Sequence, residues 1–203
     1  MTRSERSERN RAALLDAAGR VFRERGYVGA TLEGIADEAG FTKGAIYSQF
    51  RSKADLFCAL LEVRIAERAR ENAELAGNLA GEEALAALLD HVTRHSRADP
   101  DWAMALIEFR VHAARDPELN DRYAALHERT LDALAELFGS LYARAGSEPP
   151  VPRRQLAELV LAVGTGAQLE QAASPDALGW ELVADVLAQV LIRPGIVATT
   201  GLP

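Results

Sequence analysis

The sequence predicts an all-α protein of about nine helices. Along most of the 203 residues, apolar side chains recur three and four positions apart, which is the spacing of one helix face. Good N-cap residues precede several of these runs, and Gly or Pro follows them. No stretch shows the alternation of apolar and polar residues that is typical of a strand. We expect two domains, residues 1–53 and 54–203.

The first helix is predicted over residues 7–25, where Leu14, Val21 and Phe22 share one face and Gly26 follows as a stop. Four arginines precede this helix or open it: Arg3, Arg6, Arg9 and Arg11. A basic arm of this kind can reach an adjacent minor groove or phosphates, but it is equally typical of a solvated terminus. Both interpretations stay open.

Two short helices follow, separated by a tight turn. Thr31 is a good N-cap for a helix that ends at Gly40, and Thr42 is a second N-cap that opens a helix from Lys43 to Phe50. Two short helices joined in this way form a helix-turn-helix, whose second helix enters the major groove of DNA. Ser52 then begins a further helix, and Asp55 is placed to complete a capping box.

The outward side chains of the second short helix suit DNA contact. Ile46 and Phe50 form its inner face. Lys43 can reach guanine acceptors and Gln49 can bond adenine, while hydroxyl and ammonium groups can bond phosphate oxygens. Gly44 carries no side chain, so backbone can approach the duplex there. The predicted contact set is Thr31, Thr42, Lys43, Gly44, Ala45, Tyr47, Ser48, Gln49 and Lys53.

This run resembles the DNA-binding domain of the TetR family of transcriptional regulators. The positions that match the family pattern are Thr31, Ile35, Ala36, Ala39, Gly40, Gly44, Ile46, Tyr47, Phe50, Ser52, Lys53 and Leu56. Many members have His where Gln49 stands, so the base read there is expected to differ. The match covers about a quarter of the chain. It implies an N-terminal three-helix helix-turn-helix domain and a C-terminal helical domain for ligand binding and dimerisation.

Charge is distributed unevenly between the two predicted domains. The whole chain has a formal net charge of −7, but residues 1–53 hold ten Lys and Arg against seven Asp and Glu. Residues 54–203 hold 13 basic against 23 acidic residues. The basic portion therefore coincides with the helix-turn-helix, as a nucleic-acid partner requires.

The remaining helices are predicted from apolar periodicity and from breaks at Gly and Pro. The segment 146–152, GSEPPVP, is the clearest loop. The expected helices run from Ser52 to about Leu75, from Glu82 to His95, from Pro100 to Arg115, from Pro117 to about Arg144, from Arg153 to Ala173 and from Pro175 to Ile192.

The last two helices are apolar nearly all round, so they must be covered on every side. A second copy of the chain supplies this cover most simply, as a four-helix bundle between protomers. The alternative is complete burial within one chain. The predicted interface residues are Leu156, Val160, Val163, Trp180, Val183, Leu187 and Val190.

The resemblance implies that a small, largely apolar effector binds among the middle helices and spreads the two recognition helices of a dimer. Candidate pocket residues are aromatic or polar side chains on inward faces. They are Trp102, Met104, Phe109, His112, Tyr123, His127 and Gln168. The competing interpretation is that these side chains simply form the core, which is the commoner use of aromatics at helical spacing.

The sequence lacks the motifs that would indicate an enzyme, a cofactor site or a metal site. No nucleophile elbow, zincin motif or phosphate-binding loop is present, so the sequence does not predict an enzyme or a cofactor. His91 and His95 lie one helical turn apart, but no further ligand completes a metal site. Cys58 lies among apolar residues and is interpreted as a buried thiol. Without a signal segment or membrane span, a cytoplasmic protein is expected.

The sequence therefore predicts a homodimeric regulator, most simply a repressor, that leaves palindromic double-stranded operator DNA when an effector binds. Two rivals remain. One is a DNA-binding dimer without a small-molecule input. The other is a helical module whose helix-turn-helix surface binds protein.

Overall fold

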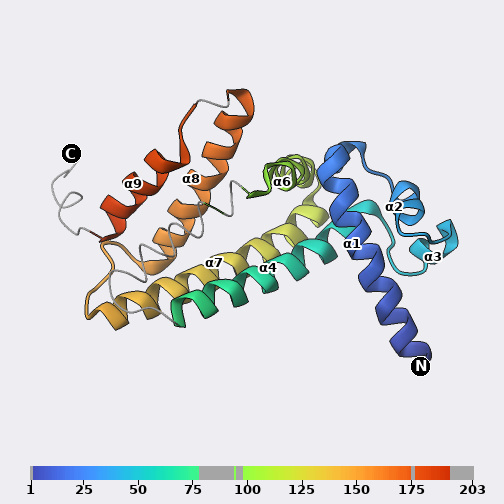
Figure 1. Ribbon diagram of the computed structural model, residues 1–203, viewed down its shortest axis with the longest axis horizontal. Coiled ribbons are helices and arrows are strands. Elements are labelled where there is room, and N and C mark those ends of the chain that lie inside the picture. The colour runs from blue at the N-terminus through green and yellow to red at the C-terminus, as the bar shows by residue number, and fades with distance from the viewer. Residues whose placement is uncertain (1, 78–93, 95–97, 175–176, 193–203) are drawn as a thin grey trace. The chain divides into compact units, whose positions relative to one another are not determined.

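The computed structural model describes residues 2–77, 94, 98–174 and 177–192, and every regular element in these ranges is a helix (Figure 1). The all-α prediction is confirmed. The helix predicted from Glu82 to His95, with both of its histidines, lies outside the described residues except for Arg94. The helices are α1 (Arg3–Gly29), α2 (Leu32–Glu38), α3 (Lys43–Tyr47), α4 (Lys53–Gly77), α6 (Pro100–Ala113), α7 (Pro117–Ala145), α8 (Arg153–Ala173) and α9 (Trp180–Ile192).

The chain packs as two compact units. The first contains Met1–Ile65 and Asp101–Leu126, and the second contains Ala66–Pro100 and His127–Pro203. Helices α4 and α7 each contribute residues to both units. The helix-turn-helix thus shares its packing unit with α6, which comes much later in the chain. The functional boundary predicted at residue 53 stays a prediction.

Helix α1 begins at Arg3, four residues earlier than predicted, because Thr2 caps it. The Thr2 hydroxyl accepts from the backbone N–H of Glu5 at 3.2 Å, and the Glu5 carboxylate accepts from the Thr2 N–H at 2.8 Å. This reciprocal pair is a capping box. The basic N-terminal residues therefore belong to a helix rather than to an extended arm.

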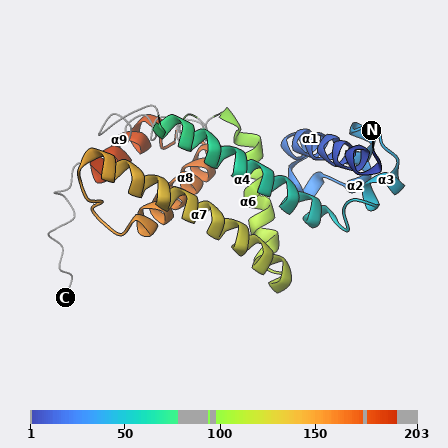
Figure 2. The same ribbon diagram turned by 90° about the horizontal axis from the view of Figure 1, so that it is seen from below.

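Aromatic rings form the centre of the first unit. Phe57 of α4 lies 4.9 Å from Phe22 of α1 and 4.3 Å from Phe109 of α6, measured between ring centroids. Tyr27 lies 5.1 Å from Phe109. Figure 2 shows α6 running across α4 and the beginning of α7. One hydrophobic core therefore joins α1–α3 to α6.

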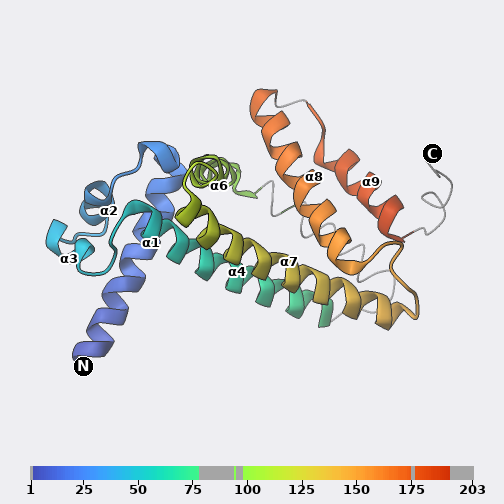
Figure 3. The ribbon, with the colours of Figure 1, turned by 180° about the vertical axis from the view of Figure 1, so that it is seen from behind.

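A second core forms where α7, α8 and α9 meet. It is built from side chains such as Phe138, Leu141 and Leu156, and α8 and α9 lie side by side (Figure 3). Five residues predicted to contact a second copy are buried in this core: Leu156, Val160, Trp180, Val183 and Leu187. Val163 is partly buried, and the side chain of Val190 is outside the described set. The predicted interface with a second copy stays a prediction.

Residues on the outer surface of these helices remain apolar. Leu159 of α8 is 39% exposed, and Leu182 and Val186 of α9 are 57% and 50% exposed. The last two helices are thus covered by their own chain on one face, and some apolar side chains on the opposite surface are left exposed. Among the described helices we find none with the length and apolar character that crossing a bilayer requires.

Candidate nucleic-acid interface

Two capping threonines set the geometry of the helix-turn-helix. The Thr31 hydroxyl accepts from the Gly34 N–H at 3.1 Å at the start of α2. The Thr42 hydroxyl accepts from the Ala45 N–H at 3.3 Å at the start of α3. Between the helices, Gly40 adopts a φ of +70°, and the Phe41 N–H bonds back to the Ala36 carbonyl at 2.8 Å. A left-handed residue closes a helix in this way, and Gly adopts it without strain.

Helix α3 is shorter than predicted. It ends at Tyr47, and the chain then tightens so that the Gln49 N–H bonds to the Ile46 carbonyl at 3.0 Å. Ile46 and Phe50 are buried, as the inner face of this segment was expected to be. Ser48 and Gln49 therefore lie on the turn that follows α3 rather than within it.

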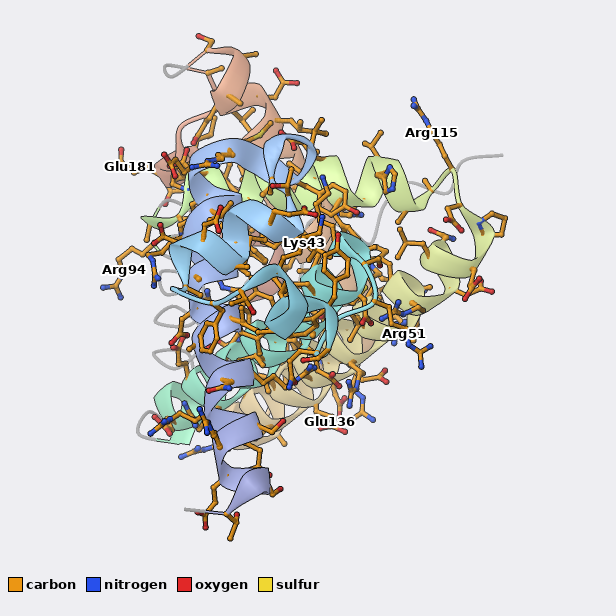
Figure 4. The ribbon with its side chains drawn as sticks, turned by 90° about the vertical axis from the view of Figure 1, so that its right-hand side faces the viewer. Lys43, Arg51, Arg94, Arg115, Glu136 and Glu181 are labelled. Carbon is orange, nitrogen blue, oxygen red and sulfur yellow. The ribbon has the colours of Figure 1, made fainter. Side chains whose placement is uncertain are left out.

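The outer surface of α3 carries Lys43, Tyr47 and an open glycine. Tyr47 is 45% exposed, and Figure 4 labels Lys43 together with Arg51 of the following turn. A Cβ placed on Gly44 would meet just the Thr42 hydroxyl, at 4.0 Å. The fold has room for a larger residue at this position, so packing within the chain does not require a glycine there.

Glu33 of α2, which is not among the predicted contact residues, links these side chains. Its Oε1 accepts from Lys43 Nζ at 2.7 Å and from the Tyr47 hydroxyl at 3.0 Å. Lys43 Nζ also lies 5.6 Å from the centre of the Tyr47 ring. A Glu in the first turn of a helix is sufficiently explained by the helix dipole, so the sequence offered no signal for this contact.

The cluster of Glu33, Lys43 and Tyr47 is electrostatically coupled. The hydrogen bond from Lys43, with further bonds from the backbone and from Tyr47, lowers the pKa of Glu33 to about 2. The same contact with Glu33 raises the pKa of Lys43 and that of Tyr47. Glu33 is therefore ionised, and Lys43 protonated, at every physiological pH.

Gln49 and Ser48 have local partners in this state. The side-chain amide of Gln49 donates to the Ser7 hydroxyl at 3.1 Å, and the Ser48 hydroxyl donates to the Ala45 carbonyl at 2.7 Å. Gln49 therefore touches α1 through a single neutral hydrogen bond, which base contact can replace at little cost.

Family models match both parts of the chain. Residues 14–60 match the model described as bacterial regulatory proteins, tetR family. Residues 80–193 match the model described as tetracyclin repressor-like, C-terminal domain, which is more than half of the chain. The chain belongs to the TetR family.

Individual relatives agree with this assignment to the TetR family. The chain is 33% identical over 125 residues to the HTH-type transcriptional repressor AcnR of Corynebacterium diphtheriae, covering 60% of this chain and 59% of AcnR. A TetR transcription regulator from Haloarcula marismortui superposes with a TM-score of 0.75 at 22% identity, covering 91% of this chain and 97% of that one. FadR from Bacillus subtilis, solved in complex with stearoyl-CoA, superposes with a TM-score of 0.72 at 18% identity. The match covers 91% of this chain and 98% of FadR. TetR-family proteins are regulators rather than enzymes.

Lys53, a position of the TetR pattern, has a structural role that the sequence did not indicate. Its Nζ donates to the carbonyl oxygens of Tyr27, Val28 and Ala30 at 2.6, 3.1 and 2.9 Å. An ammonium has three N–H donors, so these contacts use all of them. Burial lowers the pKa of Lys53. In this structure the Lys53 ammonium, which was expected to bind phosphate, instead stabilises the end of α1 and its connection to α2.

The residues predicted for a TetR-type effector pocket are divided between the two units. Trp102, Met104, Phe109, His112 and Tyr123 belong to the first, whereas His127 and Gln168 belong to the second. In the first unit the aromatics pack against their neighbours. Phe109 is fully buried, the Trp102 ring stacks on Phe57 at 5.2 Å, and Tyr123 meets Phe109 edge-on at 5.9 Å. His112 is exposed.

Proposed function

We propose that this protein is a homodimeric transcriptional repressor that binds a palindromic operator through α3 and leaves it when a small, largely apolar effector binds. The observation that carries the proposal is the exposed surface of α3, where Lys43 and Tyr47 lie on either side of an open Gly44. The similarity to AcnR, which is named as a repressor, supports the negative sign of regulation.

Dimerisation is supported by the apolar side chains that α8 and α9 leave exposed. Leu182 and Val186 are one helical turn apart and share a face of α9. Leu159 adds an exposed leucine on α8. Packing these faces against a second copy forms a four-helix bundle. A two-fold dimer then presents two α3 helices about one turn of DNA (~34–36 Å) apart, to the two halves of a palindrome.

An apolar effector is supported by the likeness of the fold to FadR, a protein solved with stearoyl-CoA. Long-chain acyl-CoA is therefore a reasonable first probe. A ligand that prefers a state unsuited to the operator weakens DNA binding by its differential affinity for the two states. A difference of about 2–3 kcal/mol would weaken operator binding about 30- to 150-fold.

The decisive experiment is selection of DNA fragments from the host genome by the purified protein, followed by titration of the selected duplex at several salt concentrations. We expect a palindromic site and a steep fall of affinity with salt, because phosphate contacts release counterions. If the helix-turn-helix surface instead binds protein, no duplex should be selected. Lys43→Met should weaken binding of the selected duplex at least tenfold.

A DNA-binding dimer without a small-molecule input is the second candidate. The packing of Trp102, Phe109 and Tyr123 favours it, since each of these rings already has an aromatic neighbour. Thermal unfolding in the presence of a panel of acyl-CoA esters and other apolar metabolites separates the two candidates. A ligand that raises the unfolding temperature and also releases the selected duplex supports the effector-controlled repressor.

A further inference from the structure

Glu33 places a negative charge on the surface that we assign to DNA. The Glu33 side chain is 43% exposed, and its Oε1 is 2.7 Å from Lys43 Nζ and 3.0 Å from the Tyr47 hydroxyl. A carboxylate here repels any phosphate that approaches α3. Since DNA binding is driven largely by cations that replace counterions, a carboxylate in this position requires a physical explanation.

The explanation lies in the hydrogen-bond acceptors that different DNA sequences present to Lys43. Paired with Glu33, Lys43 adds no net charge to the surface, so phosphates alone gain little from it. Guanine N7 and O6 in the major groove offer Lys43 a bond with defined direction. If Lys43 turns to such a base, Glu33 is free to accept from the amino group of a cytosine, which is the pairing that a carboxylate prefers. Both exchanges depend on the base pair that is present.

We propose that Glu33 is a specificity-determining residue: by neutralising and orienting Lys43, it weakens binding to arbitrary duplexes more than binding to the operator. This inference rests on the proposed function, because it requires α3 to meet DNA. It adds to that function a means of discriminating between duplexes: the bond between Lys43 and Glu33 competes with contact between Lys43 and phosphates of any sequence.

The variant Glu33→Gln tests the proposal because it removes the charge while keeping an acceptor for Tyr47. Fluorescence anisotropy would compare a scrambled duplex with the duplex selected from the host genome. On the scrambled duplex we expect about three- to tenfold tighter binding at 0.1 M salt, and a log–log salt slope steeper by about 0.9, the value for one further phosphate contact. The selected duplex should gain less, so that the specificity ratio falls.

Two further variants identify the charge that is released. Lys43→Met in the Glu33→Gln background should abolish the gain on the scrambled duplex and return its salt slope to that of the unaltered protein, because in both proteins this pair of positions carries no net charge. Lys43→Met alone should weaken the selected duplex. Glu38→Gln is the matched control, because Glu38 lies on the same helix and pairs with Arg20 at 2.8 Å. It should change the specificity ratio much less than Glu33→Gln. Circular dichroism melts would verify the fold of each variant.

Three results would overturn the role of Glu33: an equal gain on both duplexes, no gain on the scrambled duplex, or an equal effect of Glu38→Gln. If Glu33→Gln does not fold, Glu33→Ala removes the same charge, and the same three results are read from it. Failure of the unaltered protein to select any duplex would instead reject the proposed function.

Discussion

At the scale of single residues, Gln49 is proposed to read one base. It follows α3, is partly exposed and is held by one hydrogen bond to Ser7. An amide that bonds adenine in two places contributes about 1–3 kcal/mol of discrimination. Gln49→Ala should therefore relax the preference at one position of the operator.

The Gln49→Ala prediction is checked by measuring affinities for a set of single-base variants of the selected duplex. Tyr47→Phe is the comparison, because loss of a phosphate contact should weaken all members of the set about equally. If both substitutions affect every duplex alike, Gln49 is not a base-reading residue.

Gly26 is a residue whose replacement the backbone tolerates poorly. It interrupts α1 with φ +68° and ψ 178°, a conformation that belongs essentially to glycine. A Cβ at Gly26 would also lie 2.7 Å from the carboxylate oxygens of Glu108, which accepts from the Val28 N–H at 2.9 Å. Gly26→Ala should lower the free energy of unfolding by about 1–3 kcal/mol.

Urea denaturation measures the loss caused by Gly26→Ala. Gly29→Ala is the control, since a Cβ there would meet Arg25 Cβ at an ordinary 3.5 Å. A loss at Gly26 no larger than that at Gly29 would contradict the proposed strain.

At the scale of elements, the sequence predicted the helix-turn-helix closely because its signals are local. Thr31 and Thr42 act as N-caps within three residues of their partners. The early end of α3, the partners of Lys53 and the bond from Val28 to Glu108 were missed. The end of α3 was missed because Ile46 and Phe50 keep helical spacing although the backbone already forms a turn at Gln49. The other contacts join residues up to 80 positions apart, and neither periodicity nor capping carries information about them. For the same reason Glu33 could not be assigned to the site.

The connection between α1 and α2 depends on Lys53. Lys53→Met keeps the aliphatic stem but leaves three carbonyl groups without their charged donor. We expect the free energy of unfolding to fall by about 2–4 kcal/mol. The salt slope of DNA binding should be almost unchanged, because the ammonium is already committed to the protein. A salt slope of DNA binding that is reduced by about 0.9 in Lys53→Met would instead show that Lys53 contacts a phosphate.

The aromatic core that joins α1, α4 and α6 predicts a loss of stability in alkali. Burial, with a smaller contribution from the Cys58 thiol, raises the pKa of Tyr27 from 10.0 to about 12. The folded protein therefore keeps the Tyr27 proton where the unfolded chain has lost it. The free energy of unfolding should be unaffected by Tyr27 below pH 10 and should fall as the pH rises from 10 to 12.

Urea denaturation at pH 9 and at pH 11.5 checks this dependence on Tyr27. Tyr123 and Tyr142 also have pKa values raised by burial, so the whole protein loses stability in this range. In Tyr27→Phe the loss should be smaller. An identical loss in the variant would show that Tyr27 does not contribute.

At the scale of the whole molecule, we propose that the outer face of α9 forms the contact with a second copy. Leu182→Glu places a charge where an apolar contact is proposed, and Leu182 is already 57% exposed in the single chain. The fold of the chain should therefore survive while the dimer dissociates. We expect a monomer by light scattering, and operator binding at least tenfold weaker because half of the palindrome loses its partner.

Val111→Glu is the matched control for Leu182→Glu. Val111 of α6 is 53% exposed, so the substitution introduces the same charge on a different surface. It should remain dimeric. Dissociation in both variants, or in neither, would contradict the assignment of the interface to α9.

Family membership follows from two stretches of sequence that match independently, whereas the action of the protein depends on the duplex that it recognises. Protection of a selected genomic duplex from cleavage measures this most directly. The account predicts two protected half-sites related by a two-fold axis, with centres about one turn of DNA apart (~34–36 Å), and their loss in Lys43→Met. Protection of one isolated half-site, or of none at low salt, would contradict it.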